Sequence, residues 1–137
     1  MSNHLHVTQE QGKNFYMRQI QGEVVMLNLL KFKETADYSD SPHLQPDEPI
    51  SGKAAYKLYM KTVTPLLAKA GSSLLFSGKG GQVVIGPQDE YWDLVLLVKH
   101  ESVAKFMAFA NDEAYKKIAG HRTAALADSR LLPIEAL

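Results

Sequence analysis

Residues 24–32 read Val-Val-Met-Leu-Asn-Leu-Leu-Lys-Phe, and this stretch decides the fold that the sequence predicts. Side chains alternate between the two faces of a β-strand, and both faces are largely apolar here, with Asn28 as the polar exception. A strand with two apolar faces has to be covered on both sides. In a chain this short, helices can cover one side, so we expect a second copy of the protein to cover the other.

The composition predicts one compact domain. The chain has 137 residues, of which 45% are hydrophobic, and a chain of this size buries about two-thirds of the surface that its unfolded form exposes. The 15 Lys and Arg residues balance the 15 Asp and Glu residues, so no net charge attracts nucleic acid or an anionic membrane surface. We therefore expect a single domain over residues 1–137, with an N-terminal extension over 1–22 and a long loop over 33–50.

Cysteine usage and hydropathy predict a cytoplasmic protein. The sequence has no cysteine, which excludes disulfides and thiolate metal sites and agrees with a reducing compartment. Residues 1–22 lack the apolar segment of a signal peptide, and no stretch is apolar and long enough for a membrane-spanning helix. We expect the partners to be a small molecule or a second copy of the chain, and neither nucleic acid nor a membrane.

Hydrophobic periodicity and turn residues predict the remaining elements. Tyr56 and Tyr59 lie on one stripe of a helix that Ser51 can cap and Gly71 can end, and Pro65 is expected to bend this helix. The long loop is either a lid or disordered, and the extended segments at 74–76 and 83–85 form either a hairpin or one bulged strand. The predicted elements are a helix over 9–20, a strand over 24–32, a loop over 33–50, a helix over 51–70, the two extended segments, a strand over 92–99, a helix over 101–110, a helix over 115–126 and a strand over 130–134.

This order predicts an α+β fold of the ferredoxin-like type, a β-α-β-β-α-β antiparallel sheet with its helices on one face. The strand over 92–99 repeats the two-sided pattern, because Leu94 and Leu96 point to one face and Val95 and Leu97 to the other. Burying one large apolar side chain is worth about 1.5–3 kcal/mol, so an open apolar face is unfavourable in a marginally stable domain. We expect a homodimer in which two sheets pack face to face.

Four blocks of sequence carry a resemblance to a known family. They are residues 24–32, Pro-Ile-Ser-Gly-Lys-Ala-Ala-Tyr at 49–56, Trp-Asp-Leu-Val-Leu-Leu-Val at 92–98 and His-Arg-Thr-Ala-Ala-Leu-Ala-Asp-Ser-Arg-Leu at 121–131. On these blocks the chain resembles the family called domain of unknown function 1330, from about Thr8 to Pro133. The resemblance implies a dimeric α+β barrel, a superfamily that includes small monooxygenases, muconolactone isomerases and haem-binding chlorite dismutases. It implies no particular reaction and carries over no catalytic residue.

Three polar residues are candidates for a site. Asn28 lies in an apolar strand, where an unpaired buried amide costs about 1–3 kcal/mol, so it either makes a structural hydrogen bond to a loop or helix or orients a ligand. Arg122 lies on the apolar stripe of its helix and needs an anion, either an internal carboxylate of Asp93 or Asp128 or the carboxylate of a ligand. His121 is either a general base or a surface or capping residue.

Three aromatic residues complete the predicted site. Tyr56 and Tyr59 lie on the stripe of the long helix, and Trp92 opens a strand. Aromatic residues at such spacing either belong to the core or present their polar tips to a ligand at the mouth of a cavity.

These residues leave three hypotheses for the function. The first is a cofactor-independent enzyme of the monooxygenase or isomerase type, acting on a small apolar carbonyl or carboxylate compound. In that enzyme Arg122 holds the anion, His121 moves a proton, Asn28 orients the polar end and the long loop closes as a lid. The second is a non-catalytic binder of a similar ligand, and the third is a structural or regulatory homodimer. No metal site or cofactor is predicted, with a haem or metal enzyme as the minor alternative.

Overall fold

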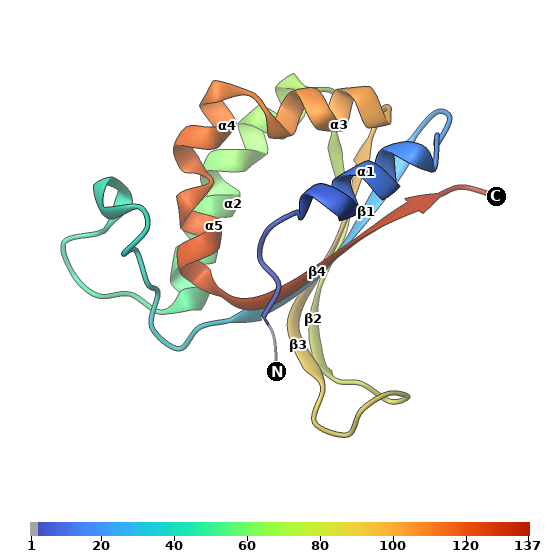
Figure 1. The fold of residues 1–137 in the computed structure, drawn as a ribbon. Helices are drawn as coiled ribbons and strands as arrows, with labels where there is room; N and C mark the ends of the chain where they lie inside the picture. Colours follow the sequence, from blue (N-terminus) through green and yellow to red (C-terminus); the bar gives the residue numbers. More distant parts are fainter. Residues whose placement is uncertain (1–2) are drawn as a thin grey trace.

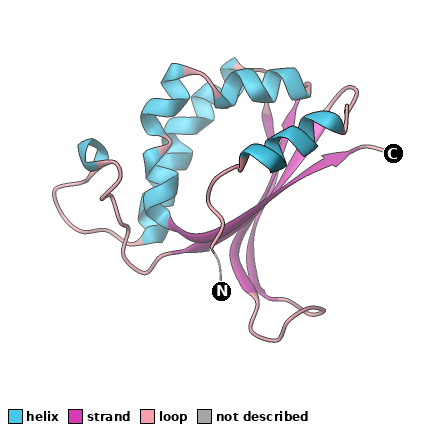
Figure 2. Cartoon of the chain, in the orientation of Figure 1, coloured by secondary structure: helices cyan, strands magenta, loops and turns pink. Residues whose placement is uncertain are grey.

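The structure is a computed structural model, and we describe its residues 3–137 (Figure 1). In chain order the elements are α1 (Gln9–Met17), β1 (Val24–Phe32), the 3₁₀ helix η1 (Pro42–Leu44), α2 (Gly52–Lys69), β2 (Ser73–Gln82), β3 (Tyr91–His100), α3 (Val103–Ala110), α4 (Glu113–Ile118), α5 (Gly120–Ala125) and β4 (Leu126–Glu135). The four strands form one antiparallel sheet in the order β2-β3-β1-β4. The helices gather on one side of this sheet (Figures 1 and 2). The predicted ferredoxin-like α+β fold is confirmed.

The core lies between the sheet and α2. Val24, Met26 and Leu30 of β1 are almost completely buried on the helix side, because every second side chain of this strand points to the helices. Tyr56 and Tyr59 of α2 belong to the same core cluster as Leu30, whereas Val24 and Met26 form a second cluster with residues of α1 and α3. The α2 residues belong to the predicted apolar stripe, so the stripe is the face that the helix buries.

The other face of the sheet is apolar and lies open. Leu27 and Leu29 of β1 alternate with the buried positions, and the register pairs Leu27 with Leu97 of β3 and with Leu132 of β4. On this face Phe76 is 57% exposed and Leu132 is 53% exposed. The two-sided apolar pattern of the central strands therefore leaves a sheet face that the chain itself does not cover.

The ends of α2 follow from its flanking residues. Ser51 Oγ accepts a hydrogen bond from Ala54 N–H at 3.0 Å, which caps the first turn. Beyond the helix, Gly71 has φ +77°, a left-handed conformation that residues with a Cβ rarely adopt. The predicted boundaries of this helix are correct to within one residue at its C-terminus.

Several predicted boundaries differ from the structure. The first helix ends at Met17, and Gln19 beyond it has φ +49°, which stops a helix. Residues 115–126 do not form one helix, because α4 ends at Ile118 and Leu126 is already extended and paired with Phe32. Residues 83–85 lie in the loop between β2 and β3, and β2 is one strand with an irregularity between Leu74 and Phe76. Of the two alternatives for this region, the hairpin is wrong and one irregular strand is found, but the prediction that residues 83–85 belong to this strand is also wrong.

The long loop after β1 packs against α5. Lys33 N–H donates to Ala125 O at 2.8 Å, and Asp37 N–H donates to Ala124 O at 2.9 Å. Tyr38, in the same loop, is only 5% exposed. The loop was predicted to have no regular structure, but it contains η1 and closes through a β-bridge between residues 35 and 51. It runs along the outer end of the helical layer, beside α5 (Figure 1).

The N-terminal segment is tied to the edge strand β4. His4 N–H donates to Asp128 Oδ1 at 2.8 Å, and Ser129 Oγ donates to His4 O at 2.5 Å. The segment continues into α1, whose Phe15 ring meets the Phe106 ring of α3 edge to face at 6.1 Å. These contacts place α1 on the helix side of the sheet, next to α3 (Figure 1). None of the helices formed by residues 3–137 is both long enough and apolar enough to cross a membrane.

Candidate functional site

A pocket of about 470 Å³ opens between α2 and the sheet. Its size falls within the range of small-molecule sites, which is about 300–1,000 Å³. The sheet contributes residues from three strands, and α2 contributes one side of its first turns. The lining residues are Phe32, Lys53, Tyr56, Lys57, Met60, Lys79, Asp93 and Leu94.

The spacing of side chains along α2 brings four of these residues together. Lys53 and Lys57 are four residues apart, as are Tyr56 and Met60, and residues at this spacing are neighbours on a helix surface. Tyr56 is buried and Met60 is half-buried, whereas both lysines are exposed. The helix therefore supplies an apolar inner wall and a charged outer edge to the same pocket.

Asp93 belongs to the wall and has a structural partner. Its Oδ2 accepts a hydrogen bond from Phe32 N–H at 2.8 Å, next to the point where the β1–β4 register shifts. The carboxylate thus fixes the end of β1 against β3. An ionised carboxylate has no proton to donate, so it acts in this contact as a hydrogen-bond acceptor. Phe32 and Leu94, on either side of this contact, form the apolar floor of the pocket.

Tyr56 supplies an aromatic wall and an unpaired hydroxyl. Its ring lies 5.7 Å from the Phe32 ring and 5.2 Å from the Tyr59 ring. Burial raises the pKa of the Tyr56 hydroxyl well above its usual range, and the nearby Arg122 charge offsets this only in part. The hydroxyl stays neutral at physiological pH, and it makes no hydrogen bond within residues 3–137. It is therefore available as a donor.

The charges around the pocket are unequal. Lys53, Lys57 and Lys79 line it, and Asp93 is its single lining carboxylate. Within residues 3–137 the ion pairs are Lys99–Glu23, Lys116–Glu113 and Arg130–Asp128, so none of the three pocket lysines is neutralised by a salt bridge. The rim of the pocket is positively charged.

Trp92 lies in a different place. With Lys31, Asp128 and Arg130 it lines a hollow of about 90 Å³ at the start of β3. Its Nε1–H donates to Glu90 Oε2 at 3.0 Å, and the Arg130 guanidinium lies 5.1 Å from its ring. Arg130 in turn binds Asp128 at 2.7 Å. Trp92 therefore belongs to a structural network of charged and aromatic groups at the edge of the open sheet face.

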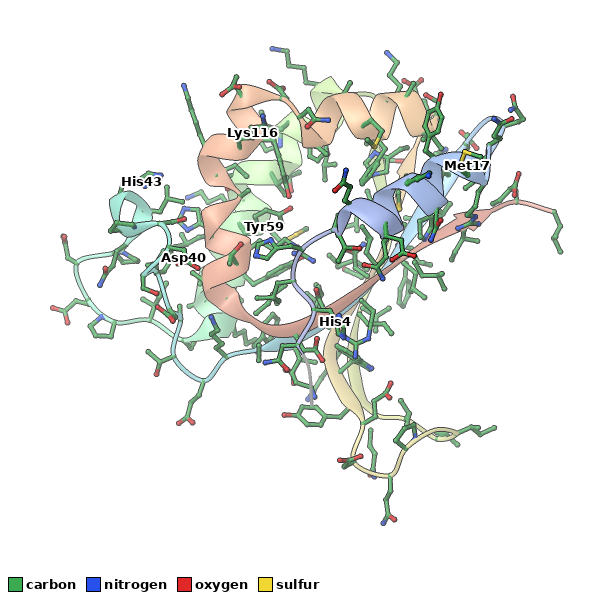
Figure 3. The ribbon with its side chains drawn as sticks, in the orientation of Figure 1. His4, Met17, Asp40, His43, Tyr59 and Lys116 are labelled. Carbon is green, nitrogen blue, oxygen red and sulfur yellow. The ribbon has the colours of Figure 1, made fainter. Side chains whose placement is uncertain are left out.

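His121 is engaged with the long loop. Its Nδ1 lies 2.8 Å from the Tyr38 hydroxyl, and the two rings meet edge to face at 5.6 Å. Burial and the nearby His43 charge lower the pKa of His121 below its ordinary value of 6.5. His43 is on the same loop, beside α5 (Figure 3). The residue is buried and anchors the loop, so the surface and capping alternative is wrong.

Arg122 has neutral partners. Its Nη1 donates to Leu5 O at 3.1 Å and its Nη2 to Ser129 Oγ at 3.4 Å. The alternative of an internal ion pair with Asp93 or Asp128 is wrong, because Asp93 binds Phe32 N–H and Asp128 binds Arg130. The physical reason is that the N-terminal segment, whose course the sequence did not predict, brings a backbone carbonyl to the guanidinium.

The two remaining candidates make short-range structural contacts. Asn28 Nδ2 donates to Met26 O at 3.2 Å, within its own strand and not to a loop or helix. The Tyr59 hydroxyl lies 3.0 Å from the Tyr115 hydroxyl, and Tyr59 points from α2 towards the inner side of the helical layer (Figure 3). Residues 3–137 contain no group of three or more His, Cys, Asp or Glu side chains that could hold a metal ion.

Of the six predicted site residues, Tyr56 lines the pocket and the other five do not. The lysines were not predicted as site residues, although Lys53 and Lys57 repeat at helical spacing beside the apolar stripe. The spacing of these lysines was one sequence feature that could have indicated the pocket. Asp93 was a second, because it is an acidic residue within a long apolar strand. Lys79 had no sequence signal, because only the antiparallel pairing of β2 with β3 places it opposite Leu94.

Comparisons with known proteins agree with this fold. The model of the family described as domain of unknown function (DUF1330) matches residues 48–137. The crystal structure of a protein of unknown function from Rhodopseudomonas palustris is 32% identical with a TM-score of 0.87, and the match covers 99% of this chain and 98% of that one. No curated protein matches the chain.

Two more distant structures are similar in fold. A protein from Bacteroides fragilis NCTC 9343, described as dimeric, of unknown function and with a ferredoxin-like fold, is 15% identical with a TM-score of 0.51, over 85% of this chain and 99% of that one. A putative antibiotic biosynthesis monooxygenase from Caulobacter crescentus CB15 is 12% identical with a TM-score of 0.50, over 90% of this chain and 98% of that one. At these identities the likeness is one of fold alone.

Proposed function

The chain belongs to the family described as domain of unknown function (DUF1330), and from this premise we propose that it is a homodimeric protein that binds a small, largely apolar carbonyl or carboxylate compound. The observation that carries the proposal is the pocket of about 470 Å³ between α2 and the sheet. An apolar floor with a few polar groups at its edge is the usual composition of a small-molecule site.

The proposed role is binding, because the groups expected to perform catalysis lie outside the pocket. His121 is bonded to Tyr38, and Arg122 is bonded to Leu5 and Ser129. The one acidic group that lines the pocket, Asp93, accepts a backbone N–H. A general base needs to be within hydrogen-bond reach of the proton that it abstracts, and His121, the predicted base, is not a lining residue. Arg122, the predicted anion-binding residue, does not line the pocket either.

The open sheet face supports the homodimer. Phe76 and Leu132 are more than half exposed there, and Leu27, Leu29 and Leu97 lie between them on the central strands. A two-fold dimer buries the same patch of both copies and so removes this apolar surface from water. The related fold from Bacteroides fragilis is described as dimeric, which agrees with this assembly.

A thermal-shift screen of small organic acids and carbonyl compounds tests the ligand. A compound at 100 times its dissociation constant stabilises the folded state by about 2.7 kcal/mol, which raises the melting temperature by about 5 °C or more in a chain of this size. We expect hits whose shift is lost in Met60→Trp, because the larger side chain fills the pocket. The matched control is Leu58→Trp, since Leu58 is on the same helix, is exposed and does not line the pocket.

Two results contradict the proposal. One is a broad library without a single stabilising compound. The other is a set of hits that stabilise Met60→Trp as strongly as they stabilise Leu58→Trp, because these compounds then bind elsewhere.

A further inference from the structure

The ligand is further defined by the charge at the mouth of the pocket. Lys53 and Lys57 line the pocket from α2 and Lys79 lines it from β2, so exposed lysine side chains border the pocket from two different elements. Within residues 3–137 none of them has a carboxylate within salt-bridge distance. Against the single carboxylate of Asp93, the three lysines leave an excess of two positive charges around the pocket.

The interior of the pocket has a different character. Phe32, Tyr56, Met60 and Leu94 present aromatic and aliphatic surface, and the Phe32 and Tyr56 rings lie 5.7 Å apart with their planes inclined by 45°. A ligand that fits both parts has a compact apolar body and a negative charge at one end. A neutral carbonyl compound would use the interior alone and leave the lysines unpaired.

We propose that the ligand is a small aromatic or otherwise flat apolar monocarboxylate, with its apolar body on the floor formed by Phe32 and Leu94 and its carboxylate at the rim, near Lys53, Lys57 and Lys79. This inference rests on the proposed function of the pocket and decides between the carbonyl and carboxylate classes. Lysines act on an anion as point charges and do not select its geometry.

Three matched probes test the inference by titration calorimetry. They are 2-naphthoate, the neutral 2-naphthamide and 2-naphthyl phosphate, which share one apolar body. We expect 2-naphthoate to bind about tenfold more tightly than 2-naphthamide at low salt, and to lose most of this advantage at about 0.5 M salt, where exposed charges are screened. Lys57→Gln and Lys79→Gln should each weaken 2-naphthoate binding by about two- to fivefold, as for exposed ion pairs, and leave 2-naphthamide binding unchanged.

Lys61→Gln is the matched control, because Lys61 is an exposed lysine of α2 that does not line the pocket. Equal binding of 2-naphthoate and 2-naphthamide, both lost in Met60→Trp, would overturn the inference and leave the proposed function standing. Tighter binding of 2-naphthyl phosphate would overturn the choice of a carboxylate. Binding of neither naphthoate nor naphthamide would overturn the inference, whereas the proposed function is tested separately by the wider screen and its Met60→Trp and Leu58→Trp variants.

Discussion

Buried histidines in this protein are held by single hydroxyl groups. His100 Nδ1 lies 2.8 Å from Ser72 Oγ, and the ring packs against Phe106 at 5.0 Å. His121 has the corresponding contact with Tyr38. Burial lowers the pKa of both histidines below the ordinary value of 6.5. A hydroxyl can pair with a neutral imidazole but does not compensate an imidazolium charge, so both residues favour the neutral form.

These histidines predict how stability depends on pH. Because the folded pKa is below the unfolded value, the unfolded chain takes up protons first as the pH falls through 6.5. We expect the free energy of unfolding to be greatest above pH 7 and to decrease between pH 7 and pH 5, by at most about 1.4 kcal/mol per pH unit for each histidine. Urea denaturation at a series of pH values measures this decrease.

The variant His100→Gln separates the contribution of His100. The glutamine amide can still form a hydrogen bond to Ser72 but does not titrate. The free energy of unfolding of the variant should therefore decrease less between pH 7 and pH 5 than that of the wild type. Asp37 and Asp128 do not interfere, because their pKa values lie below 3.8. An identical slope in the wild type and in His100→Gln would contradict this account.

At the scale of elements, the ends of β1, α2 and α5 meet at Gly52. This residue opens α2, and its N–H donates to Lys33 O at 3.0 Å, just beyond β1. Lys33 N–H donates in turn to Ala125 O at the end of α5. A Cβ on Gly52 would lie 2.2 Å from Lys33 O and 2.5 Å from Ala125 O. Both neighbours are backbone atoms, which cannot move without shifting β1 or α5.

Gly52→Ala should therefore destabilise the protein. We expect a loss of about 3 kcal/mol or more in the free energy of unfolding, at the upper end of what overpacking costs. Gly81→Ala is the matched control, because a Cβ at Gly81 would meet nothing within 4 Å. The two variants are compared by urea denaturation. Equal free energies of unfolding would contradict this prediction, because they would show that the backbone around Gly52 moves to accept a Cβ at little cost.

At the scale of the whole molecule, the open sheet face decides how the proposed homodimer forms. Leu97 lies on this face opposite Leu27, at the centre of the sheet. Leu97→Lys should dissociate the dimer, because a charge in the middle of an apolar interface is strongly unfavourable. Sedimentation velocity at micromolar concentration should find a dimer for the wild type and a monomer for the variant, with circular dichroism confirming that the variant is folded.

Val84→Lys is the control for that measurement. Val84 is 98% exposed in the loop between β2 and β3 and therefore belongs to neither apolar layer. The Val84→Lys variant should therefore remain dimeric. A wild-type chain that sediments as a folded monomer would disprove the sheet-to-sheet assembly.

The sequence by itself determined the fold, because the two-residue and three-to-four-residue periods of apolar side chains are local. Residues 24–32, the stripe of α2 and the apolar strand over 92–99 predicted the elements and their order. The same periodicity predicted that both faces of the sheet are apolar. Boundaries were less well predicted where a distant contact decides them, as at Leu126, which pairs with Phe32.

Only the tertiary structure decided the site. Tyr56 was predicted, but Lys79 and Asp93 come from strands that reach the pocket through pairing partners far away in sequence. Arg122 and His121 were assigned chemistry from their residue types, and the N-terminal segment and the long loop supplied their partners instead. Local periodicity determines which face of an element is buried, whereas a pocket depends on the distances between elements, which arise only when the whole chain has packed.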